Sequence, residues 1–372
     1  MIVVCLLAGI IWACSGKGSN SDPDPDKGTT DRKAVLINLA DNSIIPAYAN
    51  YKVKQDAMLI KSQAFLSKPD ITTLTAFRQA WVDAYTEWQK VELFDIGPAN
   101  KTAIVNYYNI YPTSVAGINE YIADPTVNLE VTASYDKQGF PALDYLLNGV
   151  GTTDAEILAF YTSSANGTKR LAYIKRITDH MDALLTKVIN DWKSTYREEF
   201  TTKTGLDIGS PMGQLVNGYV LHYERFLRSG KFGIPSGAML NGVVSAEKVE
   251  GFYKKDISKQ LAQTAHQAAV DFFNGKNAVT GASGPSFKTY LDGLGAKDSA
   301  TRKTLSEIIN AQFEVVNQKI NVLKPSIYEE VKTNNAAVVQ VYTEMQKAVR
   351  LLKVDMTAAM SIVITYTDND GD

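Results

Sequence analysis

Two acidic side chains fall on apolar helix faces, where a carboxylate needs a partner. Glu92 lies four residues after Trp88 on an aromatic stripe, and Asp144 lies three residues before Leu147. A carboxylate on a buried face must be hydrogen-bonded, ion-paired, metal-bound or protonated. We therefore predict that Glu92 and Asp144 converge in a polar pocket with Tyr108 nearby. The alternative for Asp144 is a structural carboxylate that caps a neighbouring helix.

Carboxylate and phenolate oxygens also define the metal chemistry that such a pocket would support. They are hard ligands, which suit ferric iron and other hard cations. Glu92 and Asp144 are therefore the candidate metal ligands, and iron or another divalent metal is the candidate cofactor.

His222 is the histidine best placed to face the same pocket. It lies three residues after Tyr219 and four before Phe226, on an inward-facing stripe, with Arg225 close behind it. We predict His222 and Arg225 as ligand-binding candidates, against the alternative of a core histidine. The sequence has no His-Glu-x-x-His pair, no Ser-His-Asp order and no glycine-rich phosphate loop, so no known catalytic motif explains these residues.

Long amphipathic helices are expected to position these side chains. Apolar residues recur at steps of three and four in residues 74–91, 171–192, 305–323 and 338–352, which is the period of an α-helix. Strand-like runs are short and confined to residues 243–244 and 362–366. The sequence therefore predicts an all-α protein of antiparallel helices packed as bundles.

Glycine and proline mark the predicted divisions of the chain. Residues 203–211 contain several such helix breaks, and we expect them to separate an N-terminal lobe (34–205) from a C-terminal lobe (206–372). A second glycine-rich stretch, residues 275–284, is expected to be a loop within the C-terminal lobe.

Bulk composition is that of an ordinary soluble protein. The chain has 372 residues, 45% of them hydrophobic, and a formal net charge of −2. This length is sufficient for one large domain or two smaller ones. The near-zero charge gives no electrostatic basis for nucleic-acid binding.

The first residues of the chain have the pattern of a targeting signal. A short apolar run ends at Cys14, which stands between small residues, and the run is too short to span a bilayer. Residues 1–14 resemble a bacterial lipoprotein signal that ends at a lipidated Cys14. The alternatives are a plain export signal or an unprocessed apolar N-terminus. Residues 15–33, rich in Ser, Gly, Asp and Pro, are expected to form a flexible tether, so we expect a cell-envelope protein with a lipid anchor.

Several blocks in order along the chain resemble the imelysin-like family. The family signature reads Gly-x-His-x-x-Glu, and residues 139–144 here read Gly-Phe-Pro-Ala-Leu-Asp. Residues 80–98, 108–118, 232–237 and 365–372 are similar to other blocks of the family, so the resemblance extends over residues 34–372. It implies an exported protein, often a lipoprotein, with two helical lobes that are each related to a four-helix bundle.

The signature of this chain lacks the histidine of the family. Pro141 stands in its place, and Asp144 stands in place of the glutamate. A pyrrolidine ring can neither bind a metal nor carry a proton, whereas it fits the first turn of a helix. The resemblance therefore implies Gly139, Pro141 and Asp144 as positions of the ligand site, with altered chemistry.

Three functions are compatible with this sequence. The favoured one is a non-enzymatic envelope lipoprotein that binds an iron species or a peptide for uptake, together with a transport-protein partner. A metallopeptidase of the imelysin type is the rival, and it needs a metal-activated water and usually an imidazole ligand. The third is a structural or adhesion lipoprotein with a vestigial pocket.

Overall fold

A computed structural model of the chain describes residues 25–163 and 165–367. These residues form helices and connecting segments, and none of them forms a strand, which confirms the predicted all-α class. The helices of the first half are α1 (Pro25–Asn38), α2 (Ile45–Ser67), α3 (Ile71–Trp88), α4 (Pro98–Thr102), α5 (Ile104–Tyr108), α6 (Val115–Ala123), α7 (Gly139–Asp144), α8 (Asp154–Thr162), α9 (Gly167–Asp191) and α10 (Arg197–Thr202).

The second half continues in the same way. Its helices are α11 (Pro211–Leu221), α12 (Ile234–Ser236), α13 (Ser258–Phe273), α14 (Phe287–Gly293), α15 (Leu305–Asn321), α16 (Ile327–Arg350) and α17 (Thr357–Met360). Wider π-type turns join several helices, namely η1 (Leu39–Ile44), η3 (Tyr145–Gly149), η4 (Trp192–Tyr196), η5 (His222–Gly233) and η7 (Leu351–Met356). Two short 3₁₀ turns are η2 (Thr132–Lys137) and η6 (Ala246–Lys248).

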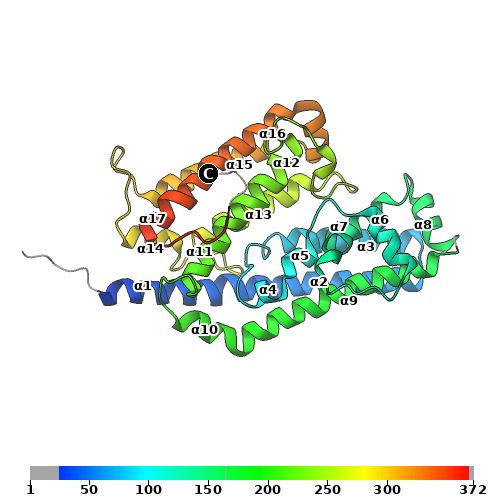
Figure 1. The fold of residues 1–372 in the computed structure, drawn as a ribbon, viewed down its shortest axis with the longest axis horizontal. Helices are drawn as coiled ribbons and strands as arrows, with labels where there is room; N and C mark the ends of the chain where they lie inside the picture. The colour runs from blue at the N-terminus through cyan, green and yellow to red at the C-terminus, as the bar shows by residue number, and fades with distance from the viewer. Residues whose placement is uncertain (1–24, 164, 368–372) are drawn as a thin grey trace, which may run out of the picture.

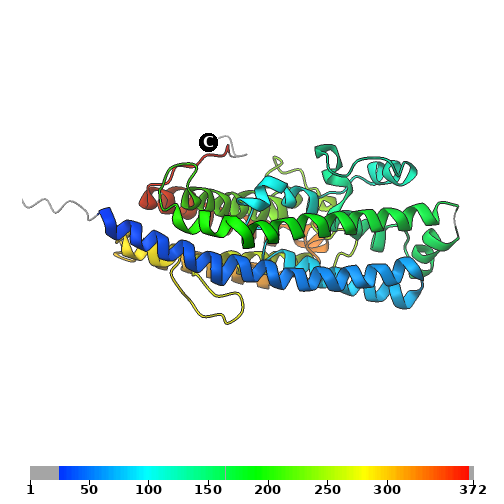
Figure 2. The ribbon, with the colours of Figure 1, turned by 90° about the horizontal axis from the view of Figure 1, so that it is seen from below.

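Helices α2, α3 and α9 form what we call the first helical group. Helix α2 packs along α3 and along α9, and the long α2 and α9 lie side by side in both ribbon views (Figures 1 and 2). Helix α3 begins at a capping box, in which Asp70 accepts from the amide of Thr73 at 2.9 Å. Its apolar stripe is buried as predicted, through Leu74, Phe77, Trp81, Tyr85 and Trp88.

Helices α13, α15 and α16 form the second helical group. Helix α15 packs on α13 and α16, and the π-type turn η5 packs on α13 and α16. Helices α9, α15 and α16 contain the predicted stripes at residues 171–192, 305–323 and 338–352. Residues 275–284 lie in the connection between α13 and α14, as expected for a loop.

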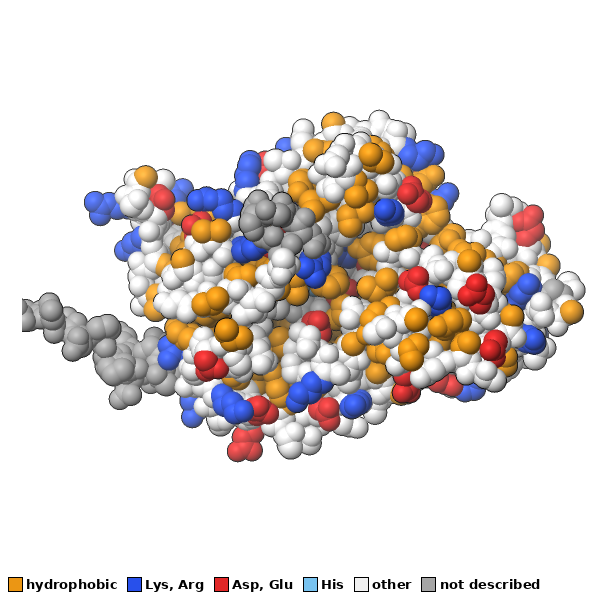
Figure 3. Space-filling model, in the orientation of Figure 1, with side chains coloured by type: hydrophobic (Ala, Val, Ile, Leu, Met, Phe, Trp, Pro, Cys, Tyr) orange, Lys and Arg blue, Asp and Glu red, His pale blue; other side chains and the backbone are white. Residues whose placement is uncertain are grey.

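The two groups meet along α3 and α13. The break predicted at residues 203–211 coincides with the connection between α10 and α11. Helix α1 reaches beyond its own half, because it packs on α11 and α14 as well as on α10. One face of the molecule is hollowed where the two groups approach each other (Figure 3).

The predicted tether needs a correction at its C-terminal end. Helix α1 begins at Pro25, so residues 25–33 are helical rather than part of a flexible segment. Arg32 ties this helix to the body through bonds to the Thr204 carbonyl (2.7 Å) and the Tyr290 hydroxyl (3.2 Å), contacts that composition cannot reveal. Residues 1–24, including Cys14, lie outside the described residues. No helix in the described part is long and apolar enough to cross a membrane.

Candidate functional site

The altered signature forms the short buried helix α7. Gly139 begins it with φ +74°, and a Cβ at this position would lie 2.3 Å from the Tyr108 carbonyl oxygen, so only glycine fits. The next residue, Phe140, stacks on Tyr85 with ring centres 4.4 Å apart and planes at 3°. Pro141 lies in the first turn of the helix, where its missing amide costs nothing. The glycine and the proline of the signature are thus explained by packing and backbone conformation.

Asp144, the last residue of α7, is held by the backbone of a distant loop. It accepts from the amides of Tyr253 and Lys254, both at 2.9 Å, and from the Asn148 side chain at 3.1 Å. Burial raises the pKa of this carboxyl to about 7, although these hydrogen bonds oppose the shift. Asp144 and Pro141 line a cavity of only about 170 Å³. Both carboxylate oxygens already have partners, so Asp144 acts as a structural cap.

Glu92 lies just beyond the end of α3 in a different buried network. Its Oε1 accepts from Trp88 Nε1 at 3.2 Å and from Asn109 Nδ2 at 2.7 Å. Tyr85 orients the amide by donating to Asn109 Oδ1 at 2.5 Å. The other oxygen of Glu92, Oε2, is buried and has no partner. Burial raises the pKa of Glu92 to about 7. The charge of the nearby Lys231 opposes this shift, and the Glu250 carboxylate adds to it.

A buried ion pair extends this network into the second half of the chain. Lys231, from η5, contacts Glu250 Oε2 and donates to Gln89 Oε1 at 2.7 Å. Glu250 Oε1 accepts from Gln89 Nε2 at 3.0 Å and from Asn109 Nδ2 at 2.8 Å. The side chains of Lys231 and Glu250 are each 2% exposed. The network therefore links the segment after α3 to η5 through charges that water cannot screen.

A cavity of about 390 Å³, which we call the interface cavity, lies between residues 92–101 and the α11–η5 junction. Four buried atoms without partners belong to three residues that line it: Glu92 Oε2, Asp95 Oδ1 and both ring nitrogens of His222. Buried polar atoms normally have partners, and each one left unpaired costs free energy. They cluster around one cavity, where water or a polar ligand can bond to them.

His222 enters the interface cavity as a neutral ring. Burial lowers its pKa to about 3, and the positive charge of Lys231 acts in the same direction. Neutral imidazole offers one N–H donor and one acceptor nitrogen. His222 begins η5 and stacks near-parallel on Phe226, with ring centres 5.8 Å apart. Such π-type stretches are frequent at functional sites.

The C-terminal segment closes one side of the interface cavity. Thr365 and Tyr366 line it. Asn217 of α11 holds this segment by donating to the Val363 carbonyl at 2.9 Å and accepting from the Thr365 amide at 2.8 Å. Tyr366 donates to Glu224 Oε2 at 2.7 Å. Side-chain bonds, rather than a helix, therefore hold this wall of the cavity.

Replacing Asn217 by alanine is expected to loosen residues 363–367. The Thr365 amide loses its acceptor, so its hydrogen exchange should rise about tenfold, the equivalent of one ordinary hydrogen bond. Hydrogen-exchange mass spectrometry of the C-terminal peptide measures this. Asn100→Ala is the control, because Asn100 lines the same cavity but contacts Asp95 instead. Unchanged exchange in Asn217→Ala would contradict the conclusion that Asn217 holds the C-terminal segment in place.

The structure brings together only part of the predicted site. Glu92 and His222 line the same cavity, whereas Asp144 has separate partners and lines another one. Tyr108 is a core residue whose hydroxyl contacts Gln55 Oε1 at 3.0 Å and the Met181 carbonyl. Arg225 donates to the Thr367 carbonyl at 2.8 Å and so helps to hold the C-terminal segment. The predicted shared pocket of Glu92 and Asp144 is therefore not formed, whereas Tyr108 does lie near Glu92, since its ring centre is 4.6 Å from that of Trp88.

The two predicted metal ligands belong to different parts of the structure. Among the described residues, no group of three or more His, Cys, Asp or Glu side chains could hold one. Glu92 and Asp144, the predicted metal ligands, take part in separate hydrogen-bond networks. Asp144 does not join Glu92 because its carboxylate accepts hydrogen bonds from the amides of residues 253 and 254. The sequence does not reveal this tertiary contact.

Several residues of the site were not predicted. Asp95 lies three residues after Glu92, but α3 ends at Trp88, so helical spacing does not explain its place in the cavity. No sequence pattern pointed to Asn217, Lys231 or Glu250. Asn217 acts through the distant C-terminal segment, and Glu250 lies in an irregular stretch without periodicity.

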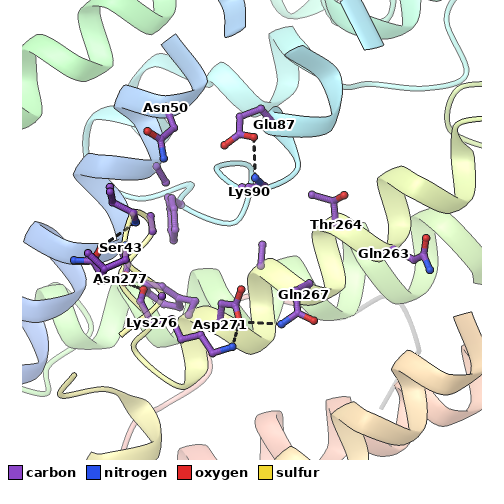
Figure 4. Close-up of a pocket in the computed structure, with 18 of the residues that line it drawn as sticks. Ser43, Asn50, Glu87, Lys90, Gln263, Thr264, Gln267, Asp271, Lys276 and Asn277 are labelled. Atoms are coloured by element: carbon purple, nitrogen blue, oxygen red, sulfur yellow. Dashed lines mark hydrogen bonds and ion pairs between the residues drawn. The ribbon is translucent and has the colours of Figure 1, made fainter. Parts of the chain in front are cut away.

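A larger cavity, about 670 Å³, lies between α2, the end of α3 and α13 (Figure 4). Its charges are already neutralised, because Glu87 pairs with Lys90 and Asp271 with Lys276, each at 2.8 Å. In the part of the chain that the structure describes, no buried atom without a partner belongs to a residue that lines it. The smaller interface cavity therefore has more unpaired polar atoms that a ligand could bond to.

Comparison with known proteins identifies the class of protein. The family model for imelysin, a peptidase family by name, matches residues 44–355. The chain therefore belongs to the imelysin family. Among curated proteins, iron-regulated protein A of Synechococcus elongatus is 26% identical over 113 residues. That match covers 30% of this chain and 31% of the relative, so the chain aligns with less than a third of its length.

Solved structures share the fold over nearly the whole chain. An iron-regulated protein A precursor from Parabacteroides distasonis matches with a TM-score of 0.70 and 17% identity, covering 91% of this chain and 97% of that one. An imelysin-like protein from Psychrobacter arcticum matches with a TM-score of 0.60 and 18% identity, covering 91% and 98%. At these identities the likeness is one of fold.

Proposed function

We propose that this chain is a ligand-binding protein of the bacterial cell envelope that does not hydrolyse its ligand. The observation that carries the proposal is the set of unpaired buried atoms of Glu92, Asp95 and His222 around one cavity. A ligand with hydrogen-bonding groups would satisfy these atoms and recover the free energy that their burial costs.

The peptidase alternative lacks support at the signature. Pro141 offers no ligand atom, and both oxygens of Asp144 are engaged by the Asn148 side chain and the amides of residues 253 and 254. A metal-activated water needs a set of protein ligands with one open position. The state of Asp144 alone would also suit a purely structural protein with a vestigial pocket. The unpaired atoms of the interface cavity favour binding instead.

An envelope location and a link to iron complete the proposal. The apolar N-terminus and Cys14 support a lipid anchor. The similar protein named as iron-regulated supports a connection with iron, for which we propose uptake. We place that link in an organic ligand or a transport-protein partner.

Native mass spectrometry and elemental analysis of the full-length chain, purified from envelopes of the producing bacterium, test this function. We expect an organic molecule at a stoichiometric level, lost in Glu92→Gln and His222→Phe and retained in Asp144→Asn. Glu92→Gln keeps the side-chain volume and His222→Phe keeps a flat aromatic ring, and circular dichroism checks that both variants are folded. Stoichiometric metal together with chelator-sensitive peptide cleavage that is lost in Asp144→Asn would overturn the proposal and support a metallopeptidase.

A further inference from the structure

The polar wall of the interface cavity is acidic. Glu92 and Asp95 both contribute an unpaired, buried carboxylate oxygen. Burial raises the pKa of Asp95 as well as that of Glu92. Lys101 is the only cation among the described residues that line the cavity, and its side chain is exposed. Lys231 is buried nearby, where its charge lowers the pKa of Glu92, but it is already paired with Glu250. The buried wall of the cavity therefore offers negatively charged acceptors that no buried lining cation pairs with.

We infer that the interface cavity binds a small organic cation whose ammonium group donates to Glu92 Oε2 and Asp95 Oδ1. The inference rests on the proposed function and names the ligand class for the same cavity. An ionised carboxylate only accepts hydrogen bonds, so it requires a donor. A charged N–H donor forms shorter and stronger bonds to carboxylates than a neutral one.

The remaining walls suit the rest of such a ligand. His222 is neutral, so it does not repel a cation, and one of its ring nitrogens can accept a hydrogen bond. Phe226 also lines the cavity, and an aromatic ring attracts an ammonium group placed over its face. A volume of about 390 Å³ lies within the range of small-molecule sites. The cavity is therefore large enough for a short aliphatic amine.

Other ligand classes fit less well. An anion would meet Glu92 and Asp95 at close range, and the buried cation near Glu92, Lys231, is already paired with Glu250. Among the described residues, no group of three or more His, Cys, Asp or Glu side chains is placed to hold a metal ion. A neutral polar molecule could donate to both oxygens, but the bonds would lack the assistance of charge.

Three four-carbon probes of one length and different charge test the inference. Butane-1,4-diamine is a dication, butane-1,4-diol is neutral and succinate is a dianion. Isothermal titration of the full-length chain in detergent, at pH 8 and low salt, should show binding of the diamine. The diol should bind at least about tenfold more weakly and succinate not at all, because only the diamine combines donors with positive charge.

Two variants locate the bound diamine. Glu92→Gln and Asp95→Asn should each weaken its binding about 10- to 100-fold, since each removes one charged acceptor while keeping the shape of the side chain. Asp95 is only partly buried, so Asp95→Asn remains informative if Glu92→Gln folds poorly. Asp144→Asn is the matched control in a different cavity and should bind the diamine as the wild type does.

The outcomes separate the ligand class from the proposed function. Binding of the diol or succinate, but not of the diamine, with a loss in Glu92→Gln would overturn the cationic class and leave a binding function at this cavity. Diamine binding that neither variant alters, or no binding of any probe up to about 10 mM, would overturn the inference. The molecule that copurifies with the wild type tests the proposed function independently of these probes.

Discussion

Lys231→Met is expected to lower the free energy of unfolding by about 3–5 kcal/mol. Lys231 is the only cation that contacts Glu250 in the described network, and both side chains are almost completely buried. Its loss leaves the Glu250 carboxylate with two neutral donors, the amide groups of Gln89 and Asn109. Methionine nearly preserves the volume of lysine, so the effect measures the lost charge rather than a new void. Urea unfolding followed by circular dichroism measures it.

A double replacement provides the control for this ion pair. In Lys231→Met/Glu250→Leu both charges disappear, and the double variant should be more stable than Lys231→Met alone. The reason is that an isolated buried charge costs more than an absent pair. If Lys231→Met unfolds at the same urea concentration as the wild type, the pair does not hold η5 against the segment after α3.

Glu92→Gln is expected to change how stability depends on pH. The pKa of Glu92 is raised from 4.5 to about 7, mainly by burial. Between these values the folded protein holds a proton that the unfolded chain has released. The contribution of Glu92 is therefore fully present below pH 4.5 and is lost as the pH rises through 7, by about 3 kcal/mol.

The difference in unfolding free energy between variant and wild type isolates this effect. It should favour Glu92→Gln at pH 8 by up to about 3 kcal/mol more than at pH 5. Lys231, Glu250 and His222 lie near Glu92 but occur in both proteins, so their own titrations largely cancel. Glu199→Gln is the control, because Glu199 is exposed and its pKa is lowered by Lys203, which gives a weak trend of opposite sign. A difference independent of pH would mean that Glu92 is ionised in the folded protein at both pH values.

Helical periodicity was sufficient to predict most of the fold. The stripes at residues 171–192 and 338–352 fall on α9 and α16, because a long helix buried on one side shows its period directly. Helix α1 was missed because its early residues have the composition of a linker. Its order depends partly on contacts such as that of Arg32 with Thr204, which lie far away in the sequence.

The site was predictable only where burial contradicted residue type. Glu92 and His222 stood out as polar residues on apolar faces, and both line the interface cavity. The same argument failed for Asp144, because burial cannot distinguish a carboxylate that caps a loop from one that faces a ligand. Lys231 and Glu250 pair across long chain separations from Gln89 and Asn109, and no local pattern encodes such contacts.

The residues of the family signature have structural roles in this chain. Gly139 is required because a larger residue would collide with the Tyr108 backbone, and Asp144 accepts hydrogen bonds from residues 253 and 254. These roles are structural and would persist without any chemistry at the motif. Membership of the imelysin family is therefore compatible with a binding role at a different cavity.

The most direct test of ligand binding at the interface cavity is ¹⁵N NMR of the histidine rings. The chain has three histidines, and two serve as internal references: His180 bonds to Gln138 at 2.6 Å, and His266 bonds to the Phe313 carbonyl at 3.0 Å. Only His222 has both ring nitrogens unpaired. On titration of the full-length chain with the low-molecular-mass fraction of the envelope, we predict shifts of the His222 nitrogens alone. Unchanged His222 signals with a saturating fraction would contradict a ligand site at this cavity.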